Sequence, residues 1–393
     1  MLTVKGKNSK GALIIEGHVQ GLSNTRSLGE AGIPVFVVDK NDCLAHYSKY
    51  CLKFFRCPDY LTDEFVSFLI DLASVHNLNG WVLIPSNDHA VFTISKHINK
   101  LEQYYKIITP SLDIIENIYD KIRLFRIAEN EKIPYPLTYS IKKIEDVDQF
   151  GINFPVIIKG RFGLSFYKKF GKKVFLAQNE AKMKEYLKRI KTSNELDNTI
   201  IQELIPSDRT NKTISFTSFC KNGEVKTFWM GAKLREHPLR FGTATFAESV
   251  YIEECYFNSI NLLKALNYTG VCEIEYLKDP RDGKYKLIEI NARTWLWVGL
   301  AKKCGIDYVK YIFDYLNDIP IIFPTEYRLS TKWINYFTDT VFSIKAILTG
   351  YLRVNEYLKS LKGEKMAAVF QTDDVMPGIM FLVLLPYIKI KRA

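Results

Sequence analysis

The sequence has no pair of cysteines in C-x-x-C spacing, and its seven cysteines are an odd number. This count and spacing do not suit a disulfide framework, which needs paired cysteines. Residues 1–10 are polar and lack the apolar region of a secretory signal. Free thiols in a reducing compartment are the simplest explanation of this composition. We therefore predict a cytoplasmic location.

Signatures of nucleic-acid binding are also missing. The chain has no zinc-finger spacing, no RNA-binding signature and no dense run of basic residues. Its formal charge of +11 arises from Lys and Arg spread along the sequence with acidic residues between them. Phosphorylated small molecules, or an anionic surface met by the C-terminus, explain that charge as well as nucleic acid does. With 393 residues and 47% hydrophobic residues, the chain is long enough for two or three domains with their own cores.

The dinucleotide fingerprint G-x-G-x-x-G is absent from the N-terminal region, although a βαβ unit is predicted there. Residues 12–16 and 35–38 are predicted to form strands. The glycine turn 17–21 lies at the N-terminus of the helix between them, where anions commonly bind. The G-x-x-x-G spacing of that turn also fits simple packing of a helix on a strand. A further strand, 80–84, leads into the polar loop 85–89, which suits a ligand or a cap for the next helix.

A predicted β-hairpin over residues 270–293 contains the strongest chemical signal. Turn residues at 279–283 separate two apolar-rich segments, as in antiparallel hairpins. In the second strand Glu289, Asn291 and Arg293 are two apart, so their side chains are predicted to share one face.

Glu275 on the first strand is expected close to Glu289 on that face, unless the register slips by one residue. Carboxylate and amide oxygens suit Mg²⁺ held together with substrate phosphates, and a guanidinium suits an anion or a charged transition state. The pattern alone also fits a solvated ribbon with a surface salt bridge.

Two apolar strands in the middle of the chain end in polar residues. The first, 154–160, includes Lys159, and a buried ammonium needs an anionic partner. Residues 161–173 are predicted to form a basic, glycine-punctuated loop, which could close over phosphates or be an ordinary turn. The second strand, 199–206, leads to Asp208, an arrangement suited to an adenine edge and ribose hydroxyls.

Taken together, these landmarks resemble those of the ATP-grasp superfamily, in the order that the family uses them. The resemblance covers about residues 11–316 and is greatest to the branch with carbamoyl-phosphate synthase domains, D-aspartate ligase and uncharacterised carboxylate-amine ligases. It implies α/β and α+β architecture, an ATP-grasp fold with an N-terminal Rossmann-like (pre-ATP-grasp) domain. The expected parts are a Rossmann-like domain (1–110), a small lobe (111–200), a large lobe with the Mg-ATP site (201–329) and a docked C-terminal extension (330–393).

The resemblance also implies roles for individual residues. ATP phosphates would be neutralised by Lys121 and Lys159, and adenine would meet Gln202, Glu203 and Leu204, with Asp208 as a ribose partner. Mg²⁺, for which Mn²⁺ is an alternative, would be held by Glu275, Glu289 and Asn291. Arg293 would stabilise the transferring phosphoryl group, and Arg235 would lie near the phosphates or the substrate carboxylate. The aromatic residues in the loop after Lys159 depart from the family pattern and put closure of that loop over ATP in doubt.

The function implied by the resemblance is ATP- and Mg²⁺-dependent joining of a small-molecule carboxylate to an amine through an acyl phosphate. The alternative is an inactive nucleotide-binding or membrane-surface binding module. The C-terminal segment 379–390 is largely apolar but shorter than the roughly twenty residues that span a bilayer. Docking on the core is favoured for this tail over peripheral membrane contact. The sequence leaves both substrates and the oligomeric state open, including a homodimer.

Overall fold

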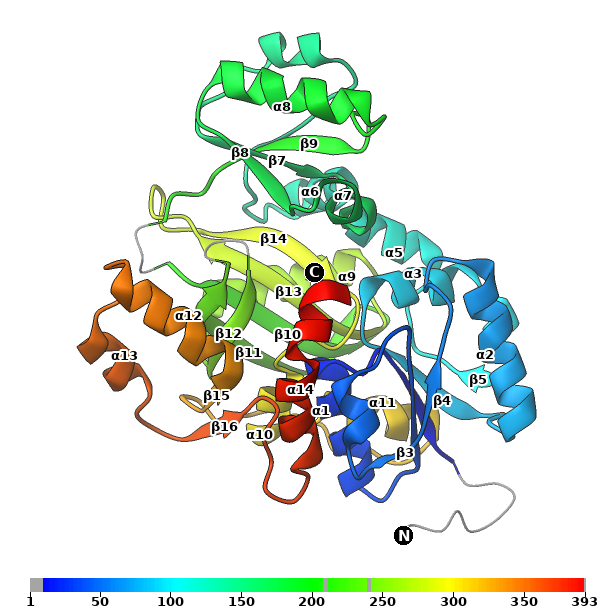
Figure 1. Ribbon diagram of the computed structural model, residues 1–393. Coiled ribbons are helices and arrows are strands. Elements are labelled where there is room, and N and C mark those ends of the chain that lie inside the picture. Colours follow the sequence, from blue (N-terminus) through cyan, green and yellow to red (C-terminus); the bar gives the residue numbers. More distant parts are fainter. Residues whose placement is uncertain (1–9, 208–210, 239–241, 392–393) are drawn as a thin grey trace.

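The computed structural model describes residues 10–207, 211–238 and 242–391, which form three β-sheets with covering helices (Figure 1). The N-terminal sheet is parallel, in the order β3-β2-β1-β4-β5. Its strands are β1 (Ala12–Ile15), β2 (Val35–Asp39), β3 (Cys51–Arg56), β4 (Trp81–Pro85) and β5 (Tyr105–Lys106). Both faces of the sheet are buried at β1 and β2, which explains why β1 is entirely apolar and β2 is apolar up to Asp39.

Helix α1 (Val19–Glu30) connects β1 to β2 in the predicted βαβ manner. The other helices of this part are η1 (Leu44–Tyr47), α2 (Asp63–His76), α3 (Asp88–Lys96), α4 (Ile98–Leu101) and α5 (Leu112–Tyr119), which follows β5. Helix α1 begins at Val19, inside the predicted glycine turn. Gly21 faces the backbone of this turn so closely that an added Cβ would lie 2.0 Å from the Glu16 carbonyl oxygen. A residue with a side chain would clash with the backbone at Glu16, so this position requires glycine.

A small antiparallel sheet, in the order β6-β9-β7-β8, forms a separate lobe at the top of Figure 1. Its strands are β6 (Thr138–Ser140), β7 (Val156–Gly160), β8 (Val174–Ala177) and β9 (Thr199–Glu203). The accompanying helices are α6 (Lys121–Asn130), η2 (Ile144–Gln149), α7 (Gly163–Phe170) and α8 (Glu180–Thr192).

The prediction that residues 161–173 form a loop is wrong, because helix α7 occupies most of that segment. Phe166 and Phe170 are one turn apart on α7, and both rings contact Phe175 of β8, at centroid distances of 5.9 and 5.7 Å. Gly171 ends the helix in the left-handed conformation, with φ of 64°. The aromatic residues thus form a core between α7 and the small sheet.

The large sheet has the order β14-β13-β10-β11-β12-β15-β16. Its strands are β10 (Thr213–Lys221), β11 (Glu224–His237), β12 (Thr243–Ser249), β13 (Gly270–Lys278), β14 (Tyr285–Asn291), β15 (Lys332–Ile334) and β16 (Lys365–Ala367). The remaining helices are α9 (Glu253–Ala265), α10 (Val298–Lys303), α11 (Tyr308–Leu316), α12 (Tyr336–Leu348), α13 (Val354–Ser360) and α14 (Met376–Lys391).

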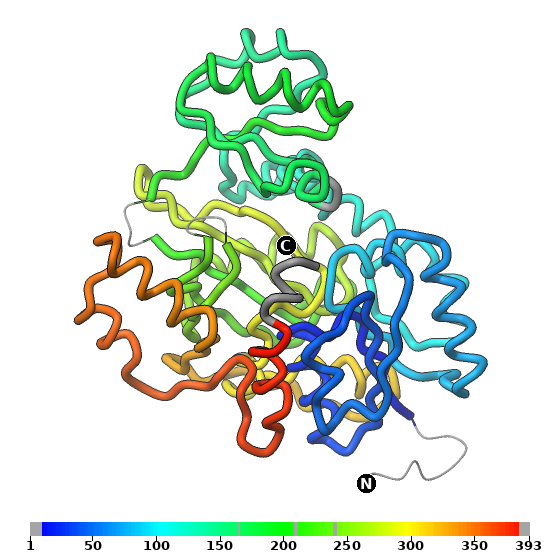
Figure 2. The backbone as a smooth tube through the Cα atoms, in the orientation of Figure 1, coloured from blue at the N-terminus to red at the C-terminus, as the bar shows by residue number. Residues whose placement is uncertain are grey.

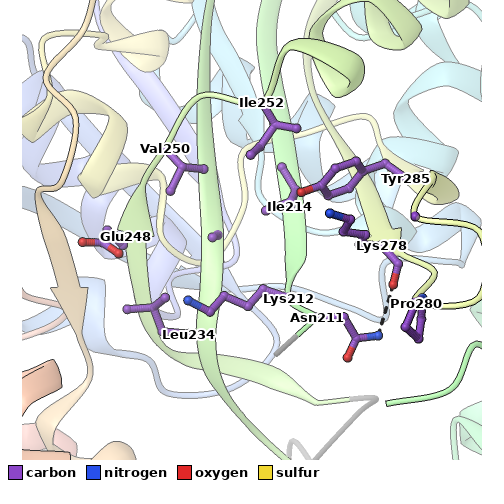
Figure 3. A pocket seen from close by; sticks show the side chains of 12 residues that line it. Asn211, Lys212, Ile214, Leu234, Glu248, Val250, Ile252, Lys278, Pro280 and Tyr285 are labelled. Carbon is purple, nitrogen blue, oxygen red and sulfur yellow. Dashed lines mark hydrogen bonds between the residues drawn. The ribbon is translucent and has the colours of Figure 1, made fainter. Parts of the chain in front are cut away.

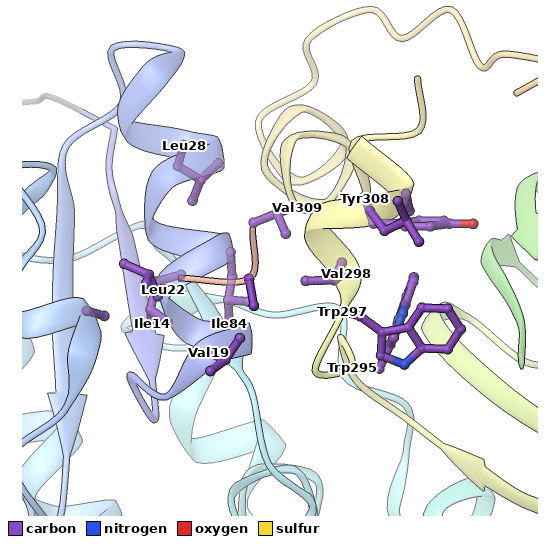
Figure 4. Close-up of a cluster of buried hydrophobic side chains, with 14 of the residues drawn as sticks. Ile14, Val19, Leu22, Leu28, Ile84, Trp295, Trp297, Val298, Tyr308 and Val309 are labelled. Carbon is purple, nitrogen blue, oxygen red and sulfur yellow. The ribbon is translucent and has the colours of Figure 1, made fainter. Parts of the chain in front are cut away.

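One hydrophobic core joins the large sheet to the N-terminal sheet (Figure 4). Val19 and Leu22 of α1 belong to the same buried cluster as Trp295, Trp297 and Val298. Helix α1 contacts both α10 and α11. This packing fixes the end of β14 against the N-terminal sheet, so residues from both sheets can contribute to one site.

The C-terminal segment returns to the N-terminal part of the molecule, where α14 contacts η1 (Figure 2). Asp374 is buried and receives hydrogen bonds from Arg26 Nε at 2.8 Å, Ser48 Oγ at 2.7 Å and the Lys49 backbone N–H at 2.8 Å. Phe381 of α14 joins the same hydrophobic core. One side of the C-terminal segment is therefore docked on the protein.

Candidate active site

Strands β13 and β14 bring four polar side chains to one face of the large sheet. Glu275 lies directly opposite Glu289, and Glu273 lies directly opposite Asn291. Residues opposed in an antiparallel pair share a face, and so do residues two apart on one strand. The predicted register of Glu275 with Glu289 is confirmed.

Lysines from both lobes surround Glu289. Burial raises the pKa of its carboxyl group, but the ammonium groups of Lys121, Lys159 and Lys233 outweigh burial and hold that pKa below its ordinary value. Lys121 and Lys159 come from α6 and β7 of the small lobe, whereas Lys233 comes from β11 of the large sheet. Glu289 is thus a charged carboxylate at the junction of the two lobes.

Lys159 is the most perturbed of these lysines. Burial and the neighbouring charge of Lys121 lower the pKa of its ammonium group to about 7, against the opposing effect of Glu289. Neither lysine makes a side-chain hydrogen bond or ion pair with another residue in the described ranges. Two adjacent ammonium groups without a bonded carboxylate form a site that an anionic ligand would stabilise.

Asp120 holds the segment after Lys159 next to Lys121. Its buried carboxylate receives two hydrogen bonds from Arg161, from Nε at 2.8 Å and from Nη2 at 2.6 Å. The same carboxylate caps α6 by accepting from the Ile122 backbone N–H at 3.0 Å. One side chain therefore fixes both the helix that begins with Lys121 and the residues that follow β7.

Glu273 belongs to the site but was not predicted. Its carboxylate accepts hydrogen bonds from Ser215 Oγ at 2.7 Å and from Asn291 Nδ2 at 3.0 Å. Burial and the nearby charge of Glu275 raise its pKa to about 7. Glu275 in turn accepts from Lys233 Nζ at 2.7 Å. The spacing of Glu273 and Glu275 could have revealed this residue, because side chains two apart on a strand share a face.

The contact of Asn291 with Glu273 determines how its amide is oriented. Because Nδ2 donates to Glu273, the carbonyl oxygen Oδ1 points away from that carboxylate, and it lies 3.5 Å from Arg293 Nη2. An amide held in this way presents an oxygen to a cation.

Arg293 is held by a residue of the N-terminal part of the chain. Its guanidinium donates to both carboxylate oxygens of Asp88, from Nε at 2.9 Å and from Nη2 at 2.8 Å. Tyr119 also donates to Asp88, at 3.2 Å. Asn87, not Asp88, caps α3 through the Ala90 backbone N–H at 2.8 Å. The loop after β4 therefore contributes a residue that positions Arg293.

The residues predicted to meet adenine lie where β9 leaves the small sheet. Gln202 Nε2 donates to Thr138 Oγ1 at 2.7 Å, so its side chain points along the small sheet. Glu203 accepts from Arg281 Nη2 at 2.7 Å and from Lys286 Nζ at 2.9 Å, which links the small lobe to the β13–β14 hairpin. The Leu204 backbone N–H donates to the Pro155 carbonyl at 3.3 Å. Asp208 lies outside the described residues.

Arg235 makes its side-chain contacts away from Glu275 and Glu289. Its guanidinium donates to Asp339 of α12 from Nε at 2.8 Å and from Nη2 at 2.7 Å, and to Ser360 Oγ at 2.7 Å. The pairing of β11 with β12 is irregular between Lys233 and Arg235, so the normal alternation does not keep both side chains on one face. The structure brings Lys233, and not Arg235, into the carboxylate cluster.

Comparisons with known proteins identify the fold. Residues 118–220 match the RimK-like ATP-grasp domain, and residues 244–313 match the ATP-binding domain of the carbamoyl-phosphate synthase L chain. The biotin carboxylase domain dimer of Hydrogenobacter thermophilus 2-oxoglutarate carboxylase, in complex with MgADP, ADP and bicarbonate, has a TM-score of 0.64 and 15% identity. That comparison covers 83% of this chain and 74% of the other. The chain has an ATP-grasp fold.

Two ligases are similar to parts of this chain, one in its solved structure and one in its sequence. The L-amino acid ligase from Bacillus licheniformis has a TM-score of 0.61 and 14% identity, over 79% of this chain and 75% of that chain. D-aspartate ligase from Enterococcus faecium (strain Aus0004) is 26% identical over 246 residues, which are 60% of this chain. The match spans 58% of that enzyme's own length. The predicted fold class and the resemblance to ATP-grasp ligases are confirmed.

The cluster on β13 and β14 has side chains whose chemistry suits Mg²⁺ bound together with phosphates. Glu275, Glu289 and Asn291 have oxygen atoms on one face of the sheet, and the pKa of the Glu289 carboxyl is lowered. Over the described ranges, no group of three or more His, Cys, Asp or Glu side chains is placed to hold a metal ion. Mg²⁺ usually takes only one or two carboxylates and completes its shell with water and substrate phosphates.

A hollow of about 560 Å³ opens on the other face of the large ATP-grasp sheet (Figure 3). Ile214 and Ala232 line it, and they alternate with Ser215 and Lys233, which point to the carboxylate cluster. Among the predicted site residues that the structure describes, which leaves out Asp208, none lines this hollow. A smaller hollow of about 30 Å³ lies beside Arg293, between the large sheet and the N-terminal part.

Proposed function

We propose that this chain is an ATP- and Mg²⁺-dependent ligase that joins a small-molecule carboxylate to an amine. The carboxylate oxygen takes the γ-phosphoryl group of ATP, which gives an acyl phosphate and ADP. The amine then forms a bond to the carbonyl carbon, loses a proton, and the phosphate leaves with the electron pair of the broken bond. The names of the D-aspartate and L-amino acid ligases support this reaction class.

The observation that carries the proposal is the charge arrangement around Glu289. A charged carboxylate faces Glu275 and is surrounded by Lys121, Lys159 and Lys233 from two lobes. Carboxylates of this kind suit a metal ion, and the lysines suit phosphate oxygens. A site that only bound a nucleotide would not need both groups together with Arg293.

We assign the ends of the nucleotide to different parts of the site. Lys121 and Lys159 would neutralise phosphate oxygens, which also favours protonation of Lys159. The adenine end would be lined by Gln202, Glu203 and Leu204. The side chains of Gln202 and Glu203 already bind other residues, so we propose that their backbone carbonyl groups accept from the adenine amino group. Asp208 stays our proposal for the ribose hydroxyls.

Glu275, Glu289 and Asn291 would hold Mg²⁺, or Mn²⁺ in its place. When bound, the metal neutralises charge on the phosphates and orients them for transfer. Arg293, fixed by Asp88, would stabilise charge on the phosphoryl group as it moves. The contacts of Arg235 with Asp339 favour a role in fastening α12 to β11 over contact with the substrate carboxylate.

We further propose that the chain is divided by function into four parts, with the predicted bounds 1–110, 111–200, 201–329 and 330–393, except that the small lobe extends to the end of β9 at Glu203. ATP would be gripped between the second and third parts. All seven cysteines are free, which suits a reducing cytoplasmic location. A homodimer is compatible with this proposal, since one solved relative is described as a domain dimer. The substrates would be a small carboxylate and a small amine.

The test is release of ADP and phosphate from Mg²⁺-ATP across a panel of carboxylates, each with and without amines such as free amino acids. A ligase is expected to release both products only when both partners are present. Binding of ATP without turnover on any pair would favour a nucleotide-binding module. No binding of Mg²⁺-ATP would contradict the assignment of the site.

The Glu289→Ala variant tests the residue on which the assignment depends. Loss of one metal ligand should abolish Mg²⁺-dependent turnover while the protein stays folded by circular dichroism. Glu248→Ala is the matched control, because Glu248 lies on the same sheet but lines the hollow on its other face. Unchanged turnover of Glu289→Ala would disprove its role.

A further inference from the structure

Exposed apolar side chains are concentrated in the C-terminal segment of the described chain. More than half of the large hydrophobic residues that are exposed lie between Tyr336 and Val383. Large contiguous apolar patches on soluble proteins usually mark an interaction surface. The nucleotide site does not use any of these residues.

Helix α12 presents one apolar stripe. Val341, Ile344 and Leu348 fall on one side of the helix, and Leu348 is 82% exposed. The opposite side of α12 contains Asp339 and Ser343, which are buried against the protein. The apolar side of α12 therefore faces solvent and its polar side faces the protein, the reverse of a usual surface helix.

Helix α14 contacts the first turn of α12 and has an exposed apolar side of its own. Phe337 lies one turn before Val341, and its ring stacks on Phe381 of α14 at a centroid distance of 4.7 Å. Phe381 is buried, whereas the next residues, Leu382 and Val383, are 56% and 61% exposed. We call Val341, Ile344, Leu348, Ile379, Leu382 and Val383 the C-terminal apolar face.

The charges around the C-terminal apolar face are mainly positive. Lys345 is exposed on α12 beside Ile344. Lys359 and Lys362 are exposed at the end of α13 and just after it, where Glu356 is an exposed acidic residue. None of the three lysines has an ion-pair partner over the described ranges. Glu364 is paired with Lys303 at 3.2 Å, so its charge is partly compensated. The sequence of residues 375–393 contains three basic residues and no acidic residue. A basic, apolar surface complements an anionic lipid headgroup layer with acyl chains beneath it.

We propose that the C-terminal apolar face docks this protein on the surface of an anionic lipid bilayer. The contact that we propose is interfacial, with apolar side chains at the level of the lipid headgroups. None of the described helices is both long and apolar enough to cross a membrane. The inner side of the same segment is fixed to the protein by Asp374 and Phe381. Membrane docking would use only the outer side and would leave the fold unchanged.

Contacts link this face to the large lobe. Asp339 of α12 receives two hydrogen bonds from Arg235 of β11, the strand that also provides Lys233. A bilayer bound at α12 would therefore lie on the side of the molecule where β11 ends. The proposal does not depend on the ligase reaction, because vesicle binding is measured without ATP.

The experiment is flotation of the purified full chain with vesicles of phosphatidylcholine alone or of phosphatidylcholine with phosphatidylglycerol. We expect binding to the anionic vesicles, weakened by high salt, and little binding to the neutral ones. Leu348→Gln and Leu382→Gln should each weaken binding about tenfold through loss of apolar burial. Lys345→Glu should weaken it by more than fivefold, since one basic residue contributes about fivefold.

Ile322→Gln is the matched control, because Ile322 is 94% exposed but lies outside the C-terminal apolar face. It should bind vesicles as the parent chain does. Equal binding by Leu348→Gln, Leu382→Gln and Ile322→Gln would overturn the proposal, and so would no binding to anionic vesicles. Sedimentation velocity of the same variants measures their oligomeric state. A parent chain that is a dimer and a Leu348→Gln variant that is a monomer would overturn the proposal, because the face would then bind a second copy of this chain.

Discussion

At the scale of single residues, the candidate site is defined by charges that compensate one another. Glu289 stays ionised because lysines surround it, and Lys159 has a pKa near 7 because it is buried beside Lys121. Glu273 and Asp88 touch residues proposed for the chemistry and orient them. These four groups give the site properties that can be measured separately.

Lys159 should take up a proton when ATP binds at pH 8. Its pKa of about 7 leaves the free amine mostly neutral at that pH, and bound phosphate favours the ammonium form. Calorimetry of ATP binding in buffers with different ionisation enthalpies should show uptake of about one proton at pH 8 and much less at pH 6. The measurement is independent of turnover.

Lys159→Arg provides the control for this uptake, since a guanidinium stays charged at both pH values. It should bind ATP without taking up the proton. The lowered pKa of Lys159 also makes stability depend on pH. Between about pH 7 and 10.5 this lysine binds more protons in the unfolded chain than in the folded one, so its contribution to the free energy of unfolding rises with pH. Undiminished proton uptake in Lys159→Arg would contradict the assignment to Lys159.

Glu273→Gln should impair metal use without unfolding the protein. A glutamine amide can turn its nitrogen toward Asn291 and reverse the orientation of that amide. Loss of such an outer contact typically costs about 10- to 100-fold in metal affinity or activity. The Mg²⁺ dependence of ADP release would measure it, with Glu248→Gln on the other face as control. An unaltered Mg²⁺ dependence would show that Glu273 does not position Asn291.

At the scale of elements, helix α7 shows how tertiary packing changes a local expectation. The segment after Lys159 is rich in glycine and lysine, which indicated a loop. Phe166 is 2% exposed and packs with Phe170 and Phe175 in the core of the small lobe. Helix formation is decided by burial of this aromatic group, which a local pattern does not report.

Phe166→Ala should destabilise the protein by about 3–5 kcal/mol, because it removes a large side chain from a packed core. Tyr167→Ala, at an exposed neighbouring position on α7, should cost much less. Urea unfolding followed by circular dichroism measures both changes. A similar loss in the two variants would indicate that α7 is not held by Phe166.

At the scale of the whole molecule, residues distant in sequence hold the parts together. Arg293 of the large lobe binds Asp88 of the N-terminal part, and Glu203 of the small lobe binds Arg281 and Lys286 of the large one. Arg26 and Asp374 join the two ends of the described chain. Each contact crosses between sheets, so the geometry of the site depends on the complete fold.

Asp374→Ala should release the C-terminal segment. Breaking a buried ion pair by removal of one partner costs about 3–5 kcal/mol, because Arg26 is left buried without its carboxylate. Limited proteolysis should then cleave near residues 368–376 faster than in the parent chain. Asp373→Ala is the control, since Asp373 pairs with Lys49 at the surface. Equal cleavage of the two variants would contradict this role of Asp374.

The sequence by itself determined the β13–β14 hairpin and the order of the landmarks, because alternation and turn chemistry are local properties. It placed Glu275 opposite Glu289 only on condition that the register did not slip, and the strand pairing in the structure settled that register. Only the tertiary structure decided which charges meet. Pairings between distant segments bring Glu273, Asp88 and Lys233 into the site. The irregular pairing of β11 with β12 places the Arg235 side chain against Asp339 instead. Such pairings depend on how sheets pack, and no short-range pattern encodes that packing.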